Sequence, residues 1–405
     1  MSFNFLLKIV LQCYYIISFK ERGSTMNKAS KFILCFSFIA ILASGFISQL
    51  LNIKQADINF FLFPDDEQLA NNLSYKETLI KISGLFLKTF QIADYYSDKN
   101  VYILDNDYII SASAKTSTDY EFNQLVSFKQ FLDENDINLV YVNQPTKYID
   151  DSIFIDNFGI PSFCNQNADL LLSRLSNAGF TVLDLRDNIR EEKLSTKDLF
   201  YRTDHHWTVP AGFWAAKHMA NTLNQTCNYS IDLNLYNPNN YTFIEHPNYW
   251  IGEQGQLVSK AYIGKDDYTV VKPNFPTRYL LKEYSSYVEG TFDDFIYQDQ
   301  IDNHIETDSA LHYAYRLRSS INLDINDGKI LFICDSYGHV TEPFLSLGVH
   351  QIDRYQPRDD YFPEGLRNHI LANNYDTVII AYAEFMIGAH DDPNSSNYRM
   401  FDFDQ

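Results

Sequence analysis

Hydrophobic and polar positions follow a pattern that predicts strands and helices in turn. Short apolar runs typical of buried strands lie at 138–142, 181–185, 330–334, 350–355 and 377–383. Apolar residues recur at helical spacing at 120–134, 168–177, 210–223, 342–347 and 363–373. Strands that alternate with helices build a parallel sheet with helices on both faces. The sequence therefore predicts a three-layer α/β/α domain with a parallel sheet.

Three segments depart from this alternation. Residues 101–104 and 108–111 flank Asp105-Asn-Asp107, which predicts a hairpin. Residues 228–325 are rich in Tyr, Asn, Asp and Pro, with short β-like pieces such as 268–271, and predict an irregular insertion or cap beside the site. The end of the chain, 391–405, is polar and is expected to be loose. We therefore expect one domain over 99–390 that carries the insertion.

The first 98 residues predict a membrane anchor and a lead-in segment. Residues 32–51 carry no charge, and a helix that rises about 1.5 Å per residue spans a bilayer's hydrocarbon core over this length. Lys28 and Lys31 precede it, and positive charge tends to stay inside, so the main domain is expected outside the cytoplasm. Residues 1–54 form the predicted single-pass anchor. A polar linker and an amphipathic helix are expected over 55–98.

Other interpretations of the N-terminus remain open. Residues 3–19 are also apolar, and form either a second span or the product of a start site placed too early, with Met26 as the alternative start. A cleaved signal peptide is the alternative to an uncleaved anchor. The weak cleavage site around residue 44 favours the anchor.

Charge and cysteine content narrow the class of protein. The formal net charge of −20 argues against nucleic acid and anionic membrane surfaces as partners. Aromatic residues make up 16% of the chain, which suits both a carbohydrate-binding surface and an ordinary core. The five cysteines form no Cys-x-x-Cys pair, so a cysteine zinc site is not expected. A disulfide between Cys164 and Cys227 stays open for a protein outside the cytoplasm.

The first candidate stretch places an acid, two imidazoles and an indole side by side. Asp204, His205, His206 and Trp207 come directly before a predicted helix, for which Thr208 is a suitable N-cap. Residues two apart in an extended turn point the same way, so Asp204 can hold one ring nitrogen of His206. This alternation favours His206 over His205 as a general base.

The second candidate stretch supplies a nucleophile. Ser336 follows the apolar run 330–334 at a strand-to-helix turn, and functional groups collect at the carboxyl ends of strands in α/β sheets. A serine hydroxyl needs a base within hydrogen-bond reach. We therefore expect Ser336, His206 and Asp204 to act as nucleophile, base and orienting acid. The backbone amides of the turn are the expected oxyanion donors.

Each of these features also has a purely structural explanation. An Asp-Ser pair after a strand often forms a turn with a capping serine, and Trp207 can belong simply to the core. Lys147, in Asn143-Gln-Pro-Thr-Lys147, follows another strand end and either faces the site or caps a loop in solvent. A zinc site is a further alternative, and its third ligand would come from His218, His246 or His339.

The two stretches together resemble a known family. Asp204-His205-His206-Trp207 resembles the signature of the DHHW proteins, which are similar to the alginate O-acetyltransferases of the SGNH hydrolase superfamily. That branch has an Asp-x-His-Trp motif and a distant Gly-Asp-Ser-aromatic motif, to which Cys334-Asp335-Ser336-Tyr337 is similar with Cys in place of Gly. Further similarities lie at Pro145-Thr-Lys147, Asp353-Arg354 and Tyr382-Ala-Glu384. The resemblance covers residues 100 to 225 and 325 to 390, in order.

The resemblance implies a three-layer SGNH-hydrolase-like, flavodoxin-like fold and a Ser336–His206–Asp204 triad. It also implies acetyl-ester chemistry on an extracytoplasmic polysaccharide, with a membrane-bound O-acyltransferase as the partner that supplies acetyl groups. Neither a metal nor a cofactor is expected. The candidates for substrate binding or oxyanion stabilisation are Tyr337, Lys147, Gln144, Trp207 and His205.

Two other functions remain open at this point. The same triad with water as acceptor makes an esterase or polysaccharide deacetylase, because both enzymes share the acyl-enzyme step. The second alternative is a non-catalytic polysaccharide-binding or assembly protein with a degenerate site. Cys334 and the unassigned insertion 228–325 keep this alternative open.

Overall fold

The computed structural model describes most of the chain after residue 99. Described are residues 85, 95–96, 100–258, 260–283, 285–302, 313, 317–360, 362–388 and 396–404. The predicted anchor and almost all of the linker and lead-in helix lie outside these residues. Within the described part, no helix combines the length and apolarity needed to cross a bilayer. The chain divides into two compact units, Met1–Ala93 with Val258–Tyr262, and Asp94–Leu257 with Ile263–Gln405, and the fold below is that of the second.

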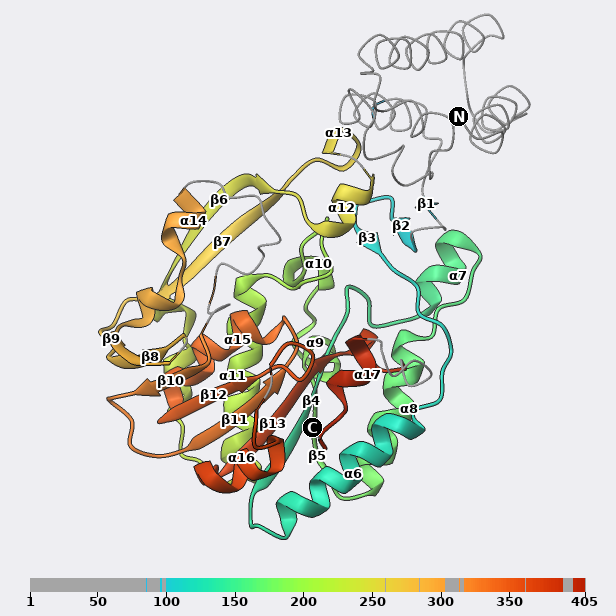
Figure 1. Ribbon diagram of the computed structural model, residues 1–405. Coiled ribbons are helices and arrows are strands. Elements are labelled where there is room, and N and C mark those ends of the chain that lie inside the picture. Colours follow the sequence, from blue (N-terminus) through green and yellow to red (C-terminus); the bar gives the residue numbers. More distant parts are fainter. Residues whose placement is uncertain are drawn as a thin grey trace, which may run out of the picture. The chain divides into compact units, whose positions relative to one another are not determined.

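An eight-stranded mixed sheet forms the centre of this unit (Figure 1). Its strands lie in the order β5 (Thr181–Asp184), β4 (Asn138–Gln144), β13 (Thr377–Ala383), β11 (Lys329–Cys334), β12 (Gln351–Tyr355), β10 (Ser319–Asn322), β8 (Tyr279–Lys282) and β9 (Tyr287–Gly290). β5 to β12 pair in parallel, whereas β10, β8 and β9 pair antiparallel. The predicted parallel sheet is therefore correct for the first five strands and wrong for the other three. The insertion 228–325 supplies those three, so it extends the sheet as well as adding irregular structure.

The order of the parallel strands explains why the serine follows the histidine in the chain. Counted from β11 through β12 and β13 and then on to β4 and β5, the spatial order becomes 2-1-3-4-5, read from the β12 side. That is the flavodoxin-like order. The sheet thus has the flavodoxin-like strand order with circularly permuted connections. The strand that precedes Ser336, β11, is strand 1 in the flavodoxin-like numbering but the third of the five parallel strands along the chain.

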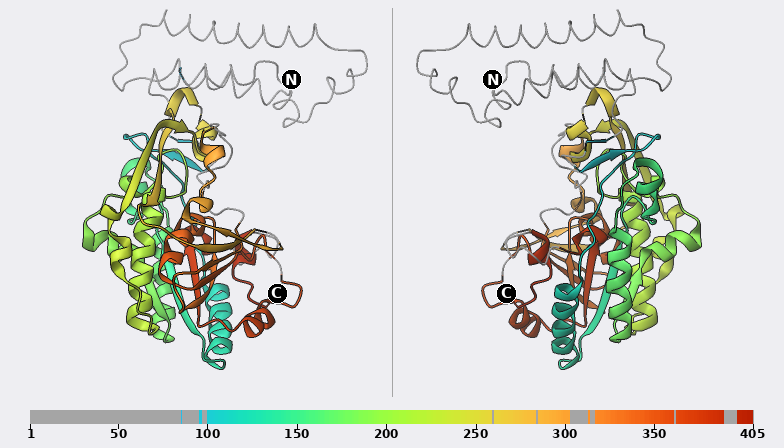
Figure 2. Two further views of the ribbon diagram at one scale, coloured as in Figure 1. Left: turned by 90° about the vertical axis from the view of Figure 1, so that its left-hand side faces the viewer. Right: turned by 90° about the vertical axis from the view of Figure 1, so that its right-hand side faces the viewer.

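Helices cover both faces of the sheet, as Figure 2 shows from two sides. Val140 and Val142 of β4 pack on one face with α9 (Leu185–Glu192), α11 (Val209–Thr226) and α15 (Gly338–Leu345). Leu139 and Tyr141 pack on the other with α6 (Asp119–Asp133), α8 (Cys164–Asn177), α16 (Leu366–Asn373) and α17 (Ser396–Met400). Because successive side chains of a strand point to opposite faces, an apolar run without alternation fills both layers. The predicted three layers are present.

Smaller elements surround this core. The predicted hairpin is confirmed by β2 (Val101–Ile103) and β3 (Ile109–Ile110), which pair antiparallel, with β1 (Tyr95–Tyr96) alongside. A separate two-stranded sheet contains β6 (Tyr241–Trp250) and β7 (Asp266–Pro273), and β7 includes the β-like piece predicted at 268–271. The remaining helical segments of this unit are α7 (Ser152–Phe158), α10 (Thr196–Leu199), η3 (Leu233–Tyr236), η4 (Pro238–Asn240), α12 (Glu253–Val258), η5 (Phe292–Phe295), α14 (Gln298–Asp302), η6 (Ser346–Gly348) and η7 (Glu384–Met386). The short helix α13 (Lys260–Ile263) belongs mainly to the first unit.

The C-terminal segment is packed rather than loose where the structure describes it. Met400, Phe401 and Phe403 are each at most 1% exposed, and the Phe403 ring stacks on Phe128 of α6 at 4.6 Å between centroids. The expectation of a loose tail is therefore wrong for these residues. The tail was predicted to be loose because most of its residues are polar. Its few apolar residues, Met400, Phe401 and Phe403, pack in the core.

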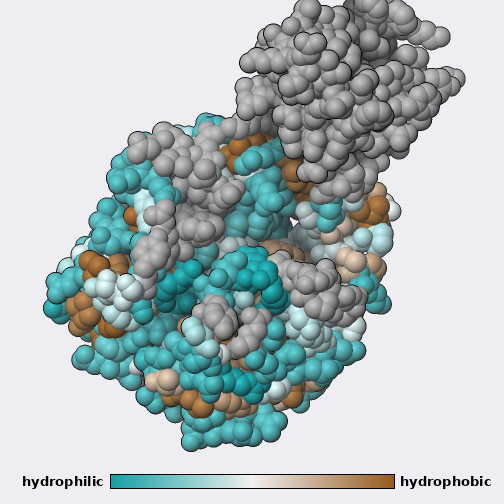
Figure 3. Space-filling model, viewed as in Figure 1, coloured by the Kyte–Doolittle hydropathy of each residue, from teal (hydrophilic) through white to brown (hydrophobic). Residues whose placement is uncertain are grey.

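The abundant aromatic residues serve mainly as core. Among the large hydrophobic side chains described as exposed, Phe243 and Tyr287 are the aromatic ones, each 41% exposed. On the face shown in Figure 3, hydrophilic residues predominate in the described surface and hydrophobic ones form small separate patches. In the part of the chain that the structure describes, packing thus explains most of the aromatic side chains.

Candidate active site

A tight loop before α11 carries the acid and the two imidazoles. Phe200 and Trp207 form an antiparallel bridge across it, and Tyr201 donates its backbone N–H to the carbonyl of His206 at 3.2 Å. Thr208 caps α11 as predicted, because its side chain accepts a hydrogen bond from the Ala211 N–H at 3.3 Å. The chain is thereby reversed over 200–207, which leaves Asp204 and His206 near the tip of the loop.

The candidate nucleophile lies in the turn between β11 and α15. The fully buried Asp335 carboxylate accepts the N–H of Tyr337 at 2.9 Å and that of Ala383 at 2.7 Å, which ties this turn to the end of β13. Ser336 itself is partly exposed. The turn therefore presents its hydroxyl at the carboxyl edge of the sheet.

Cys334 fits at the position where the related motif has glycine. It is fully buried and is not among the described residues with positive φ, so its backbone does not require glycine. A Cβ on Gly338 would overlap the Cys334 sulfur and lie 2.6 Å from its Cβ. The missing side chain at Gly338 thus makes room for the cysteine, and the turn keeps its shape.

The two stretches meet through hydrogen bonds. Nε2 of His206 lies 2.7 Å from Oγ of Ser336, and Nδ1 of His206 lies 2.6 Å from Oδ1 of Asp204. Oδ1 also accepts the backbone N–H of His206 at 2.9 Å. His206 and Asp204 are buried. Ser336, His206 and Asp204 are therefore hydrogen-bonded in the order that a Ser–His–Asp mechanism requires.

The surroundings of Asp204 favour its ionised form. Burial opposes ionisation of Asp204, but His206, through its charge and hydrogen bonds, outweighs burial and holds the pKa of Asp204 below its usual value. Burial, with the nearby His206, lowers the pKa of His205 to about 3. At neutral pH the ionised Asp204 can thus stabilise an imidazolium on His206, while His205 stays neutral.

Trp207 and Tyr337 lock the two stretches together. The indole Nε1–H of Trp207 donates to the backbone carbonyl of Tyr337 at 3.1 Å, and the Tyr337 hydroxyl donates to the carbonyl of His205 at 2.5 Å. Their ring centroids are 5.0 Å apart, and each side chain is only 1% exposed. Trp207 therefore lies in the core and joins the two stretches there.

Residues of the insertion hold Asp204 and its neighbour Thr203 through hydrogen bonds. The sequence did not predict these contacts. The N–H of Glu253 donates to Oδ2 of Asp204 at 2.8 Å, and the N–H of Gly252 donates to Oγ1 of Thr203 at 2.8 Å. Asp266 accepts both the N–H and the hydroxyl of Thr203, at 2.7 and 2.6 Å. A Cβ at position 252 would lie 2.8 Å from the Asp204 Cα, so only glycine allows this approach. The nearest sequence signal is the pair Gly252 and Gly255, within a segment that otherwise has few glycines.

A cavity of 440 Å³ adjoins the site. His205 and Tyr337, the chain neighbours of His206 and Ser336, belong to its lining. The others are Asn100, Val101, Ile110, Ser111, Ala112, Ser113, Thr146, Lys147, Tyr148, Cys164, Glu253, Gln254, Leu257 and Phe385. Pockets that combine apolar and aromatic rings with a few placed polar groups are typical of substrate sites.

Lys147 and Gln144 have different surroundings. Lys147 is 8% exposed, and its Nζ donates to the carbonyls of Ile109 at 2.7 Å and Arg202 at 3.0 Å and to Oε1 of Gln254 at 2.9 Å. Burial lowers its pKa to about 7, against the opposing effect of Asp204. Gln144 is fully buried outside the cavity lining, and its amide has no hydrogen-bond partner in the described part of the chain. Lys147 thus lies in the cavity wall, which agrees with the interpretation that it faces the site and not with a loop cap in solvent.

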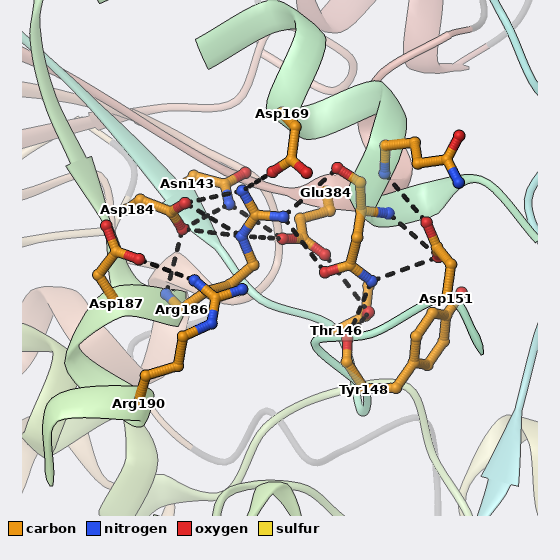
Figure 4. Close-up of polar contacts among 12 residues, drawn as sticks. Asn143, Thr146, Tyr148, Asp151, Asp169, Asp184, Arg186, Asp187, Arg190 and Glu384 are labelled. Carbon is orange, nitrogen blue, oxygen red and sulfur yellow. Dashed lines mark hydrogen bonds and ion pairs between the residues drawn. The ribbon is translucent and has the colours of Figure 1, made fainter. Parts of the chain in front are cut away.

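Figure 4 shows a charged cluster that contacts the loop after β4 through Thr146, a residue of the cavity lining. Arg186 is 2% exposed and pairs with Asp184 and Asp169 at 2.7 Å each and with Glu384 at 3.0 Å. Glu384 in turn accepts from the Thr146 hydroxyl at 3.5 Å. Burial raises the pKa of Glu384 to about 7, although Arg186 opposes this. The cluster joins β5, α8, α9 and the end of β13, and so fixes one wall of the site.

The zinc alternative receives little support from this geometry. Within the described residues, the group that could hold a metal is Asp204, His205 and His206, and the three histidines considered as a third ligand are not part of it. Both ring nitrogens of His206 already face Asp204 and Ser336. Cys164 and Cys227 are free thiols in this structure.

The chain has an SGNH-hydrolase-like α/β fold with a mixed sheet. Residues 104–259 match the family described as "SGNH hydrolase-like domain, acetyltransferase AlgX". The resemblance expected from the DHHW and Asp-Ser motifs is thereby confirmed. A search of curated proteins gives no match.

Solved structures share the fold at low sequence identity. PatB1 of Bacillus cereus is 18% identical, with a TM-score of 0.59 over 75% of this chain and 100% of that one. A PatB1 structure with a sulfonyl adduct gives a TM-score of 0.57 at 18% identity, over 76% and 99% of the two chains. A DHHW family protein from Eubacterium siraeum is 15% identical, with a TM-score of 0.54 over 72% and 92%.

Proposed function

We propose that this protein is an O-acetyltransferase that modifies a cell-surface or secreted polysaccharide through an acetyl ester on Ser336. The observation that carries the proposal is the hydrogen-bonded order Ser336–His206–Asp204 beside a 440 Å³ cavity. The match of residues 104–259 to an acetyltransferase family supports transfer of an acetyl group.

The geometry supports a two-step reaction. His206 Nε2 takes the Ser336 proton as Oγ attacks the acetyl carbonyl, and returns it to the leaving group of the donor. An acceptor hydroxyl then gives its proton to His206 and attacks the acetyl ester, and Ser336 recovers its proton as the ester bond breaks. Asp204 stabilises the imidazolium in both steps.

The oxyanion donor of the turn is best assigned to Ser336. The N–H groups of Tyr337, Gly338 and His339 already donate to Asp335 Oδ1, Asp335 O and Ser336 O. The Ser336 N–H has no acceptor among the described hydrogen bonds, so it is free to bind a developing negative charge. The sequence predicts that several backbone amides of the turn donate to the oxyanion. We propose instead that the Ser336 N–H alone does so.

The cellular setting is also part of the proposal. A single-pass helix at 32–51 would hold the domain outside the cytoplasm, and a membrane-bound O-acyltransferase would supply the acetyl group. The net charge of −20 supports the absence of nucleic acid among its partners. The second candidate function, a polysaccharide deacetylase or esterase, uses the same residues with water as acceptor.

One experiment separates the functions. Purified protein is incubated with p-nitrophenyl acetate and glycan oligomers, and acetylated glycan and acetate are measured together. We expect acetylated glycan from the wild type, none from Ser336→Ala, and wild-type amounts from Ser173→Ala, whose serine is exposed on α8. Acetate as the sole product at every glycan concentration would favour the esterase. Undiminished transfer by Ser336→Ala would refute the proposal.

A further inference from the structure

Three polar side chains of the cavity wall form a chain of hydrogen bonds that the triad does not use. Nζ of Lys147 donates to Oε1 of Gln254 at 2.9 Å, and Nε2 of Gln254 donates to Oγ of Ser111 at 3.0 Å. The three residues come from the β4 loop, α12 and the end of the β3 hairpin, and all line the same cavity. This chain of hydrogen bonds runs along the cavity wall from the buried Lys147 ammonium to the Ser111 hydroxyl.

The buried cation fixes the direction of every hydrogen in this chain. An ammonium has three N–H donors and no acceptor, so the Gln254 atom that faces it must be oxygen. The amide nitrogen then faces Ser111 and occupies an acceptor site of its hydroxyl. The Ser111 hydrogen therefore cannot point at Gln254, and it has no other acceptor side chain or carbonyl among the described hydrogen bonds.

Lys147 itself is not available to a ligand. Its other two N–H groups donate to the carbonyls of Ile109 and Arg202, at 2.7 and 3.0 Å. All three donors are therefore engaged within the protein, and the charge acts through Gln254. Ser111 is the member of the chain that keeps a free donor, and it is half-buried rather than enclosed.

We propose that Ser111 binds the acceptor glycan by donating its hydroxyl hydrogen to a glycan oxygen, and that Lys147 and Gln254 are positioning residues that orient this hydrogen. This inference rests on the proposed function and specifies how the cavity holds the acceptor. The partner is an oxygen with a free lone pair: a hydroxyl, a ring or glycosidic oxygen, or the carbonyl of an N-acetyl group. A glycan nitrogen that carries only hydrogens does not fit.

Gln254→Glu tests the direction of the chain with little change in shape. The carboxylate still accepts from Lys147, but it has no N–H, so the Ser111 hydroxyl turns and donates to it. The substrate contact is then lost even though every protein contact survives. We expect Ser111→Ala and Gln254→Glu each to raise the acceptor KM roughly three- to tenfold, the range for one neutral hydrogen bond.

The assay measures acetyl transfer at pH 6 with p-nitrophenyl acetate as donor. Maltopentaose, cellopentaose and chitopentaose serve as probes, and the best acceptor of the wild type is used for the variants. Each rate is divided by the amount of protein that forms an acetyl ester on Ser336 in the same sample, and KM and kcat are then fitted separately. Ser111→Thr keeps the hydroxyl and is the matched control, expected within about twofold of wild type.

The double variant distinguishes the chain from two unrelated effects. If Gln254→Glu acts through Ser111, adding it to Ser111→Ala raises KM no further. Additive effects, or an unchanged KM in either single variant, would overturn the inference while transfer by the wild type upholds the proposed function. A wild type that transfers to none of the probes but releases acetate would instead count against the proposed function, and this inference would fall with it.

Discussion

Replacement of Gly252 by alanine tests whether the insertion positions Asp204 for its proposed role. The added Cβ would overlap the side chain of Asp204, lying 2.5 Å from Oδ2 and 2.8 Å from Cα. Backbone atoms cannot rotate away, so either the 252–253 segment or the Asp204 loop must move. Either movement lengthens the 2.8 Å hydrogen bond from the Glu253 N–H to Asp204.

The size of the effect follows from these contacts. Overpacking of this kind costs about 1–3 kcal/mol of unfolding free energy. A hydrogen bond to a charged group contributes about 1.5–3 kcal/mol, and its loss in the transition state corresponds to a fall in kcat of roughly ten- to a hundredfold. We expect the fall in kcat to exceed what partial unfolding explains, because the moved carboxylate no longer aligns His206.

The assay combines urea unfolding with the rate at which p-nitrophenyl acetate acetylates Ser336. Gly290→Ala is the matched control within the same insertion, because the new Cβ would lie 3.0 Å or more from its nearest neighbours, which are flexible side-chain atoms of Asp294 and Leu281. We expect that control to acetylate at the wild-type rate. Full acetylation by a folded Gly252→Ala protein would refute the claim that this segment holds Asp204.

Three further predictions concern the surroundings of the site. Trp207→Phe removes the 3.1 Å hydrogen bond to the Tyr337 carbonyl, and should lower kcat about three- to tenfold with donor KM little changed, measured by steady-state kinetics; an unchanged kcat would contradict it. Arg186→Met strips the buried carboxylates of their cation and should cost about 3–5 kcal/mol in urea unfolding, whereas the exposed-pair control Arg190→Met should cost less than about 1 kcal/mol. For Lys147, the folded pKa of about 7 lies below the unfolded value near 10.4, so the unfolded chain binds more protons between these limits. Wild-type stability should therefore rise relative to Lys147→Met as pH increases above 7, by up to roughly 1.4 kcal/mol per pH unit, and a flat difference between pH 7 and 9 would contradict the lowered pKa.

The central strands were predictable because they are buried on both faces. The runs at β11, at β13 and at 139–142 within β4 are almost wholly apolar, which is the signature of a strand that packs helices on each side. The strands β9 and β10 have the sequences Tyr-Val-Glu-Gly and Ser-Ser-Ile-Asn, which carry no such signal. β10 joins the sheet by pairing with β12 and β8, which are distant in the chain, and β9 joins it by pairing with β8. The sequence therefore predicts an irregular insertion or cap with short β-like pieces, but not its place in the central sheet.

The site shows the same division between local and distant information. The alternation argument selected His206 correctly as the imidazole nearest Asp204, because both residues lie in one short loop. The approach of Gly252 to Asp204 and the contacts of Lys147 join segments 38 to 107 residues apart, and a single sequence carries no trace of them. The sequence alone also does not show that Cys334 fits in the turn because Gly338 lacks a side chain.

The most direct test of the account is to look for the acetyl group itself. The wild-type protein is mixed with p-nitrophenyl acetate, quenched in acid within the first turnover, digested and analysed by mass spectrometry. The account predicts an acetyl ester on Ser336 that disappears when a glycan acceptor is added before the quench. An unmodified Ser336 in protein that is turning over, or an acetyl group that accumulates on another residue, would contradict it.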